Sequence, residues 1–225
     1  LGALPQLRCI SRCGVGTDSI DLAAAQQRSI AIYTTPQEII DPVAELTVAM
    51  ILALSRHLPA HLAEMRRGEW KRRTGWLLSE WAVGLVGFGR IGQGVERLLR
   101  AFGPRILIAD AQRPRAIPVG CEFVELAALL PQCDVVSVHV SQPKTLGPVL
   151  GRPQLRAMKA GSRLVNTSRG YLVDEQALHE LLVSGHLSGA ALDVFDAEPY
   201  AGPLACYPQV LVTPQALVAV QVTRV

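Results

Sequence analysis

Short apolar runs alternate with longer segments of helical periodicity along this chain. The runs are nearly free of polar positions, which is typical of strands that are buried on both faces of a sheet. They predict strands at residues 8–11, 30–33, 82–86, 106–109, 135–138, 163–166, 190–194 and 210–212. Helical patterns lie between them at residues 21–28, 42–56, 91–101, 125–130 and 174–184. This alternation predicts an α/β fold, with a doubly wound parallel sheet covered by helices on both sides.

The hydrophobic pattern also indicates a domain boundary near residue 42. The segment before it holds only two strands and one helix, too few for a separate domain. Asp41 and Pro42 then begin a long apolar helix with Pro in its first turn, which we expect to continue to about Gly68. We therefore predict three parts: the C-terminal half of one domain at 1–42, a complete nucleotide-binding domain at 43–208, and a crossing back with an atypical tail at 209–225.

Composition excludes several classes of protein. The 225 residues are 49% hydrophobic and 18% charged, which is too apolar for a disordered chain. The net charge of +3 is small, and it does not by itself indicate a nucleic-acid or membrane partner. The five cysteines form no CxxC pair and no zinc spacing, so we expect a reducing compartment, the cytoplasm, and no metal site. The start of the chain shows no signal-peptide pattern, and its longest apolar stretch, 43–54, is shorter than a membrane span.

A glycine-rich turn carries the strongest chemical signal. Gly87, Gly89 and Gly92 form the spacing GxGxxG between a predicted strand and a predicted helix, which is the context of a dinucleotide-binding turn. The helix N-terminus would offer free N–H groups to the pyrophosphate. Asp110 ends the next strand, where a carboxylate bonds the ribose and favours NAD over NADP, although Arg113 lies near enough to accept a phosphate. The alternative is a glycine turn that binds no ligand.

Three further segments follow predicted strands and hold candidate site residues. Residues 166–170 contain Arg169, which could clamp a carboxylate. Residues 191–199 contain two acidic groups, and residues 11–18 contain two glycines whose neighbouring N–H groups suit a small anion. Taken alone, each segment is equally consistent with an ordinary surface turn.

These segments, in this order, resemble the D-isomer specific 2-hydroxyacid dehydrogenase family, especially its phosphoglycerate dehydrogenase-like members. Residues 43–47 and 172–178 are also similar to family segments, and the resemblance extends to about Pro214. It implies a Rossmann NAD-binding domain joined to a flavodoxin-like substrate domain, of which only part is expected here. It further implies NAD as cofactor and hydride transfer to or from a small 2-hydroxy or 2-oxo acid, such as phosphoglycerate, hydroxypyruvate or glyoxylate.

The resemblance also implies roles for individual residues. Arg169 would hold the substrate carboxylate, together with the backbone N–H groups of Val15 and Gly16. Glu198 would pair with a catalytic histidine and raise its pKa. The cofactor positions that the family implies are Thr47, Gly87, Gly89, Arg90, Ile91, Gly92, Asp110, His139, Thr167 and Asp193.

The catalytic histidine that the family implies is absent. The family pattern at this point is Thr-Pro-His, whereas Thr213 and Pro214 are followed here by Gln215, whose amide cannot exchange a proton at pH 7. Loss of a general acid–base group typically costs about 10²–10⁴-fold in rate. Residues 216–225 depart from the family as well, and the chain has no initiator Met. We therefore expect a chain truncated or altered at both ends, which binds NAD but turns over slowly or not at all.

Three further points concern the partners and the function of the chain. Residues 66–73 hold five basic residues and a Trp, as nucleic-acid footprints do, but the small net charge favours a solvated helix end. A non-catalytic NAD(H) sensor or scaffold on the same fold is the main rival function. The family forms dimers through the NAD-binding domain, and the helix at 42–56 is apolar almost all round, so we expect a homodimer. Burial of that helix between two domains of one subunit is the alternative.

Overall fold

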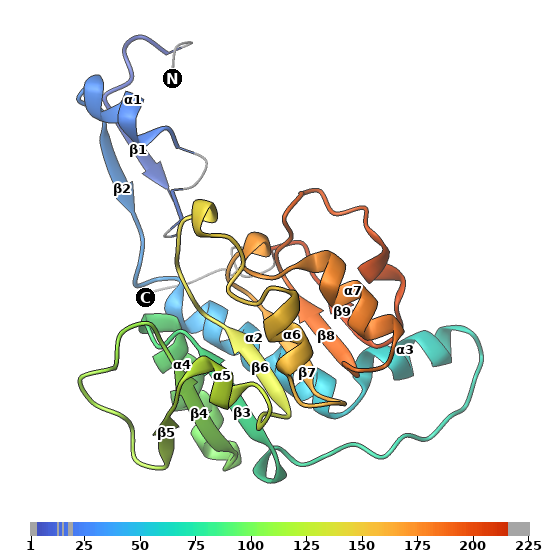
Figure 1. Cartoon of the computed structure of the whole chain (residues 1–225). Coiled ribbons are helices and arrows are strands. Elements are labelled where there is room, and N and C mark those ends of the chain that lie inside the picture. Colours follow the sequence, from blue (N-terminus) through green and yellow to red (C-terminus); the bar gives the residue numbers. More distant parts are fainter. Residues whose placement is uncertain (1–3, 13, 15, 18–19, 216–225) are drawn as a thin grey trace, which may run out of the picture.

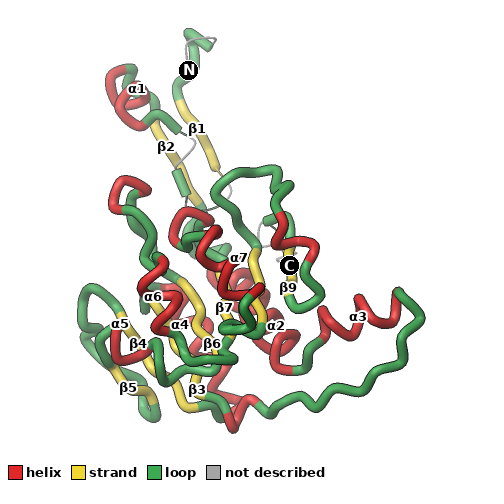
Figure 2. Tube along the Cα trace, turned by 45° about the vertical axis from the view of Figure 1, so that its right-hand side comes forward, coloured by secondary structure: helices red, strands yellow, loops and turns green. Residues whose placement is uncertain are grey.

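The computed structural model describes residues 4–12, 14, 16–17 and 20–215. A small N-terminal unit contains two parallel strands, β1 (Cys9–Arg12) and β2 (Ala31–Thr34), which are connected through α1 (Leu22–Gln27). This unit stands apart from the rest of the chain in both views (Figures 1 and 2). The large sheet begins only after the long helix that follows it.

The large sheet is entirely parallel and has the strand order β5-β4-β3-β6-β7-β8-β9. Its strands are β3 (Ala82–Val86), β4 (Arg105–Ala109), β5 (Cys121–Phe123), β6 (Val135–Val138), β7 (Arg163–Asn166), β8 (Gly189–Leu192) and β9 (Val210–Val212). The chain runs outward in one direction through β4 and β5, and in the other through β6 to β9. The point of reversal lies between β3 and β6, and a crevice for ligands is expected at the carboxyl ends of those strands. The predicted doubly wound α/β fold is confirmed.

Helices cover both faces of this sheet (Figure 1). On one face α2 (Ile40–Ser55) and α4 (Arg90–Leu99) bury Val83 and Leu85 of β3. On the other face α5 (Leu126–Leu129), α6 (Arg152–Ala157) and α7 (Glu175–Val183) pack in the same core as Val86. Adjacent residues of one strand therefore serve opposite layers, which explains why the strands carry almost no polar positions.

The long helix predicted from residue 42 to Gly68 is wrong in its second half. The structure ends α2 at Ser55 and begins α3 (Leu58–Arg66) after a bend of 64°. Pro59 has no N–H with which to continue the helix, and Ser55 O instead accepts the N–H of Trp76 at 3.0 Å. Among the described residues, no single helix is long and apolar enough to cross a membrane.

Two short elements of the large sheet and its helices were missed. Strand β5 has three residues with Glu122 at its centre, and α6 has one buried apolar residue, Leu155, so neither shows a clear period. Strand β9 is the edge strand of the large sheet, which therefore continues past residue 208. The division into a partial substrate domain and a nucleotide-binding domain stays a prediction.

Candidate functional site

The glycine turn lies between β3 and α4. Gly87 has φ +95°, and a Cβ there would lie 2.6 Å from the carbonyl carbon of His139. A Cβ on Gly92 would lie 2.4 Å from Gly87 O, so the first turn of α4 packs directly on the loop. At Gly89, by contrast, no atom lies within 4 Å of the Cβ position. Two glycines are thus required by packing, while the middle one leaves open space over which a ligand can approach.

Asp110 is fixed beside this turn at the end of β4. Its Oδ2 accepts the backbone N–H of Phe88 at 2.6 Å, and its Oδ1 accepts that of Gln112 at 2.9 Å. Two backbone donors therefore hold the carboxylate at the edge of the crevice, where it can accept ribose hydroxyls and repel a 2′-phosphate. The guanidinium of Arg113 lies 5.5 Å from the ring centre of Phe123 on β5. That cation–π contact holds a basic group over β5, three residues after Asp110 in the chain.

His139 supplies an unusual feature on the other side of the reversal point. It follows β6, it is only 8% exposed, and neither ring nitrogen has a partner among the described residues. Burial lowers the pKa of His139 to about 4, so the ring is neutral at physiological pH. A buried polar group without a partner is costly. Two orphaned nitrogens at the crevice therefore fit a site whose ligand completes the hydrogen bonding.

The loop after β7 is pinned by its own polar side chains. Asn166 Nδ2 donates to Arg169 O at 2.8 Å, and Asn166 Oδ1 accepts the N–H of Ser168 at 3.0 Å. The hydroxyls of Thr167 and Thr47 are 2.9 Å apart, which ties this loop to α2. Thr47 and Thr167, both predicted cofactor residues, thus come together from distant parts of the chain. Arg169 is half-buried, and its guanidinium donates to the carbonyl of Ser168 at 2.8 Å.

Asp193 links the last three strands. Its side chain is fully buried and accepts the hydroxyl hydrogen bond of Thr213. Its backbone N–H donates to Asn166 O at 3.0 Å, and its carbonyl accepts the N–H of Gln215 at 3.0 Å. The segment that carries Gln215 is therefore fixed to the loop that follows β8. Asp193 thus stabilises the fold, in addition to its predicted role in cofactor binding.

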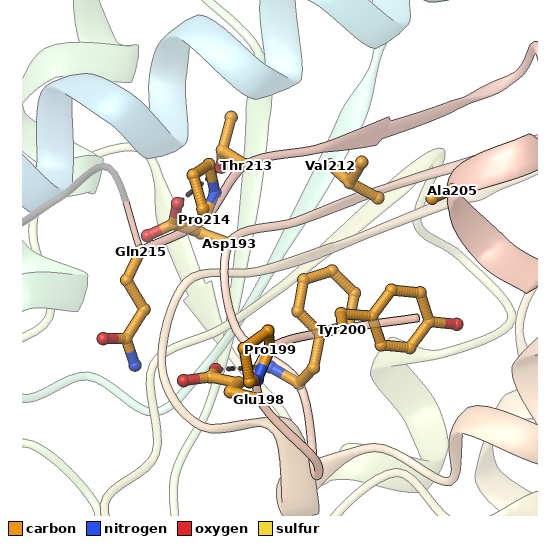
Figure 3. A pocket seen from close by; sticks show the side chains of 10 residues that line it. Asp193, Glu198, Pro199, Tyr200, Ala205, Val212, Thr213, Pro214 and Gln215 are labelled. Carbon is orange, nitrogen blue, oxygen red and sulfur yellow. Dashed lines mark hydrogen bonds between the residues drawn. The ribbon is translucent and has the colours of Figure 1, made fainter. Parts of the chain in front are cut away.

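An open hollow of about 570 Å³ lies beside these strand ends. It is lined by Asp193, Phe195, Glu198, Pro199, Tyr200, Ala205, Val212, Thr213, Pro214 and Gln215. Asp193 and Thr213 lie on one side and Glu198 on the other, and the side chain of Gln215 extends toward Glu198 (Figure 3). Glu198 Oε1 accepts the backbone N–H of Phe195 at 2.9 Å. Both Glu198 and Gln215 are exposed in this structure.

Close backbone packing joins the loop that carries Arg169 to the loop that carries Phe195. A Cβ on Gly170 would lie 1.9 Å from the carbonyl carbon of Phe195, so only glycine lets the two loops touch. Sequence reasoning placed Gly170 in the arginine segment but gave it no role. Val15 lies outside the described residues, whereas Gly16 is described in the small N-terminal unit. The predicted carboxylate-binding groups thus come from two separate sheets.

Sequence reasoning missed the residues that hold the loop around Glu198. Glu175, at the start of α7, accepts the N–H of Asp196 at 2.7 Å, and burial raises the pKa of Glu175. Asp196 also forms an ion pair with Lys144, and Tyr200 stacks on Phe195 with ring centres 4.0 Å apart. In the sequence, the one sign that could have pointed to Glu175 is its position directly after Asp174, the residue that caps α7.

Comparison with known proteins agrees with this geometry. Residues 48–216 match the family model of the D-isomer specific 2-hydroxyacid dehydrogenase NAD binding domain. A glyoxylate reductase of Thermococcus litoralis is 38% identical over 87% of this chain and 62% of its own length. A D-3-phosphoglycerate dehydrogenase of Mycobacterium tuberculosis is 40% identical over 95% of this chain but only 42% of its own length. The chain therefore spans about two fifths to three fifths of these two relatives.

A solved structure leads to the same family. The D-lactate dehydrogenase of Aquifex aeolicus, complexed with NAD and lactic acid, is 31% identical, with a TM-score of 0.85 over 96% of this chain and 72% of its own. The family match covers all the strand ends that build the cofactor crevice and the hollow. This chain belongs to the D-isomer specific 2-hydroxyacid dehydrogenase family and contains its NAD binding domain.

Proposed function

We propose that this chain is an NAD-dependent oxidoreductase that transfers a hydride between the nicotinamide and a 2-hydroxy or 2-oxo acid. Phosphoglycerate, hydroxypyruvate and glyoxylate are the substrates suggested by the relatives. The observation that carries the proposal is the Asp110 carboxylate, which two backbone N–H groups fix against an open glycine turn. That arrangement holds the carboxylate where it can accept the hydroxyls of a diol-bearing nucleotide.

The residues present fit NAD. The open space at Gly89 and the N-terminus of α4 would take the pyrophosphate, and Asp110 would take the adenosine ribose. The orphaned nitrogens of His139 lie at the same crevice and would gain partners. When bound, NAD supplies the hydride acceptor. NADP is the weaker candidate, because Asp110 carries a negative charge where its phosphate would lie.

The substrate side is less complete than the cofactor side. Arg169 would hold the substrate carboxylate through a bidentate ion pair, with help from Val15 and Gly16. Glu198 is present, but Gln215 stands where the family pattern has its histidine, and an amide cannot deliver a proton to the substrate oxygen. We therefore propose slow turnover of 2-oxo acids. The second candidate function, an NAD(H)-dependent sensor or scaffold, is favoured by the same residue.

Restoration of the histidine tests this proposal. NADH oxidation with hydroxypyruvate, glyoxylate and 2-oxoglutarate is measured for the unmodified chain and for Gln215→His, with Gln6→His as the matched control. We expect Gln215→His to raise turnover by about 10²–10⁴-fold and Gln6→His to change nothing. If the unmodified chain turned over as fast as Gln215→His, that result would contradict the role given to Gln215. NADH binding without turnover in any variant would contradict the oxidoreductase and favour the sensor.

We also propose a homodimer, on a different basis from the sequence prediction. The apolar residues of α2, such as Val43 and Met50, are already buried within one chain, so they need no second copy. One group of exposed apolar side chains lies on α3 and the connection after it, where they are 42–77% exposed: Leu58, Leu62, Met65, Trp70, Trp76 and Leu77. Such a surface is typical of a protein interface. Light scattering that shows a monomer at micromolar concentration would contradict it.

A further inference from the structure

The charge of the hollow is the starting point for a statement about the substrate. Among the described residues that line it, Asp193 and Glu198 are acidic and none is basic. Asp193 accepts the Thr213 hydroxyl, but Glu198 has no ion pair among the described residues. Its carboxylate accepts a hydrogen bond from the backbone N–H of Phe195. In a site with a histidine at position 215, an imidazolium would compensate this carboxylate, whereas Gln215 brings no charge.

The reduction of a 2-oxo acid suits this arrangement poorly. Hydride addition to a ketone carbon leaves negative charge on the oxygen, which then needs a proton from a nearby acid. Gln215 cannot supply that proton, and the carboxylate of Glu198 would oppose the developing charge. An iminium group has the opposite requirement. Its nitrogen already carries a positive charge, so hydride addition neutralises it and needs no acid.

We propose that this site acts on the iminium formed from a 2-oxo acid and an amine, a proposal that rests on the proposed oxidoreductase function. Condensation of the two in solution releases water and gives the iminium. Its carbon gains the hydride from a reduced nicotinamide cofactor, which is oxidised, and the C=N π pair becomes the nitrogen lone pair. The product amine then takes a proton from water. No step requires a proton from the protein.

The side chains at the hollow match each part of such a substrate. Arg169 does not line the hollow itself, but its neighbour Gly170 packs directly on the backbone of Phe195, so its loop lies beside the hollow and would hold the carboxylate. Glu198 would face the cationic nitrogen, and the carbonyl oxygen of Gln215 can accept its N–H, which an imidazolium could not. The stacked rings of Phe195 and Tyr200 offer apolar surface for a substituent of the amine. The substrate would thus be a zwitterion with opposite charges recognised on two adjacent loops.

Binding of product analogues tests this assignment without turnover. N-methyl-D-alanine, a secondary ammonium acid, and D-lactate, the matching hydroxy acid, are titrated by calorimetry into the chain saturated with NAD. We expect the ammonium acid to bind about tenfold or more tightly, as for one charge-assisted contact. Glu198→Gln should abolish this preference, and Gln215→His should reverse it. Glu80→Gln removes an exposed carboxylate at the opposite end of β3 and should leave the preference intact.

Turnover gives the second readout. NADH oxidation is followed with pyruvate alone and with pyruvate plus methylamine. We expect the amine to raise the rate at least about tenfold, because the ketone lacks its general acid whereas the iminium needs none. Equal binding of the two acids, a preference that survives Glu198→Gln, or equal rates with and without the amine would each overturn the proposal. A chain that binds no NADH refutes the proposed function as a whole. NADH binding without a preference for the ammonium acid refutes this inference alone.

Discussion

The two halves of the crevice differ in how completely they are built. The cofactor half, at the ends of β3, β4 and β6, has an open glycine turn, a carboxylate held by two backbone donors and a buried histidine that lacks partners. The other half, at the ends of β7, β8 and β9, is called the catalytic half after its proposed role. It has exposed Glu198 and Gln215 side chains and no acid–base histidine among its described residues. The comparison teaches that the residues expected to bind the cofactor and those expected to transfer a proton come from different strand ends, so one set can be complete while the other is not.

The largest expected effect concerns His139 in the cofactor half. Its pKa of about 4 in the folded chain lies below the ordinary value near 6.5, so the unfolded chain takes up a proton first as the pH falls. As far as His139 is concerned, the free energy of unfolding is therefore highest above pH 6.5. It falls by up to about 3 kcal/mol between pH 6.5 and 4. Urea unfolding at pH 7.5 and 4.5 measures this loss. His139→Asn should remove most of it, and equal pH dependence in both chains would contradict the burial argument.

A matched pair of glycine substitutions separates packing from binding in the same half. Gly92→Ala places a Cβ 2.4 Å from Gly87 O, and we expect a loss of about 1–3 kcal/mol in unfolding free energy. Gly89→Ala meets no atom within 4 Å, so stability should change by less than about 0.5 kcal/mol while NADH affinity falls at least about tenfold. Chemical denaturation and calorimetry make the two measurements. Unchanged NADH affinity in a folded Gly89→Ala chain would show that the ligand does not pass over this turn.

A smaller effect is expected at Asp110, which decides between the two cofactors. Asp110→Ser removes the charge that opposes a 2′-phosphate and leaves Arg113 in place to attract it. We expect the affinity ratio of NADPH to NADH to rise by about tenfold, the value of one ionic hydrogen bond. Calorimetric titration with each nucleotide gives the ratio. Glu45→Gln on the exposed side of α2 is the charge-matched control, and an equal shift in it would mean that net charge, not the site, sets the preference.

Much of the large sheet could be predicted because its strands are buried on both faces. Strands β3, β6 and β7 begin and end at the predicted residues, since an apolar run bounded by polar residues leaves little choice. The edge strand β9 does so too, because all three of its residues are apolar. The edge strand β5 and the short helix α6 were missed because solvent contact removes that signal. The break between α2 and α3 depends on Pro59, which lies inside an otherwise helical pattern.

The candidate site was predictable only where local spacing determines geometry. Gly87 and Asp110 follow strand ends, so their places at the crevice came from the sequence. The pairing of Thr47 with Thr167 joins residues 120 positions apart, and the contact of Gly170 with Phe195 depends on two loops that meet only in the folded sheet. The lack of hydrogen-bond partners for the His139 ring among the described residues depends on all the residues that surround it in the folded chain. Such features need the tertiary structure because no local pattern encodes them.

The central claim is that the cofactor half works although the catalytic half lacks its histidine. The most direct test is calorimetric titration of the unmodified chain with NADH at pH 7.5, with Asp110→Ala titrated alongside. The account predicts saturable binding at one NADH per chain, with a Kd between about 1 µM and 1 mM, and weaker binding by Asp110→Ala. No saturable binding at millimolar NADH, or identical binding by Asp110→Ala, would contradict it.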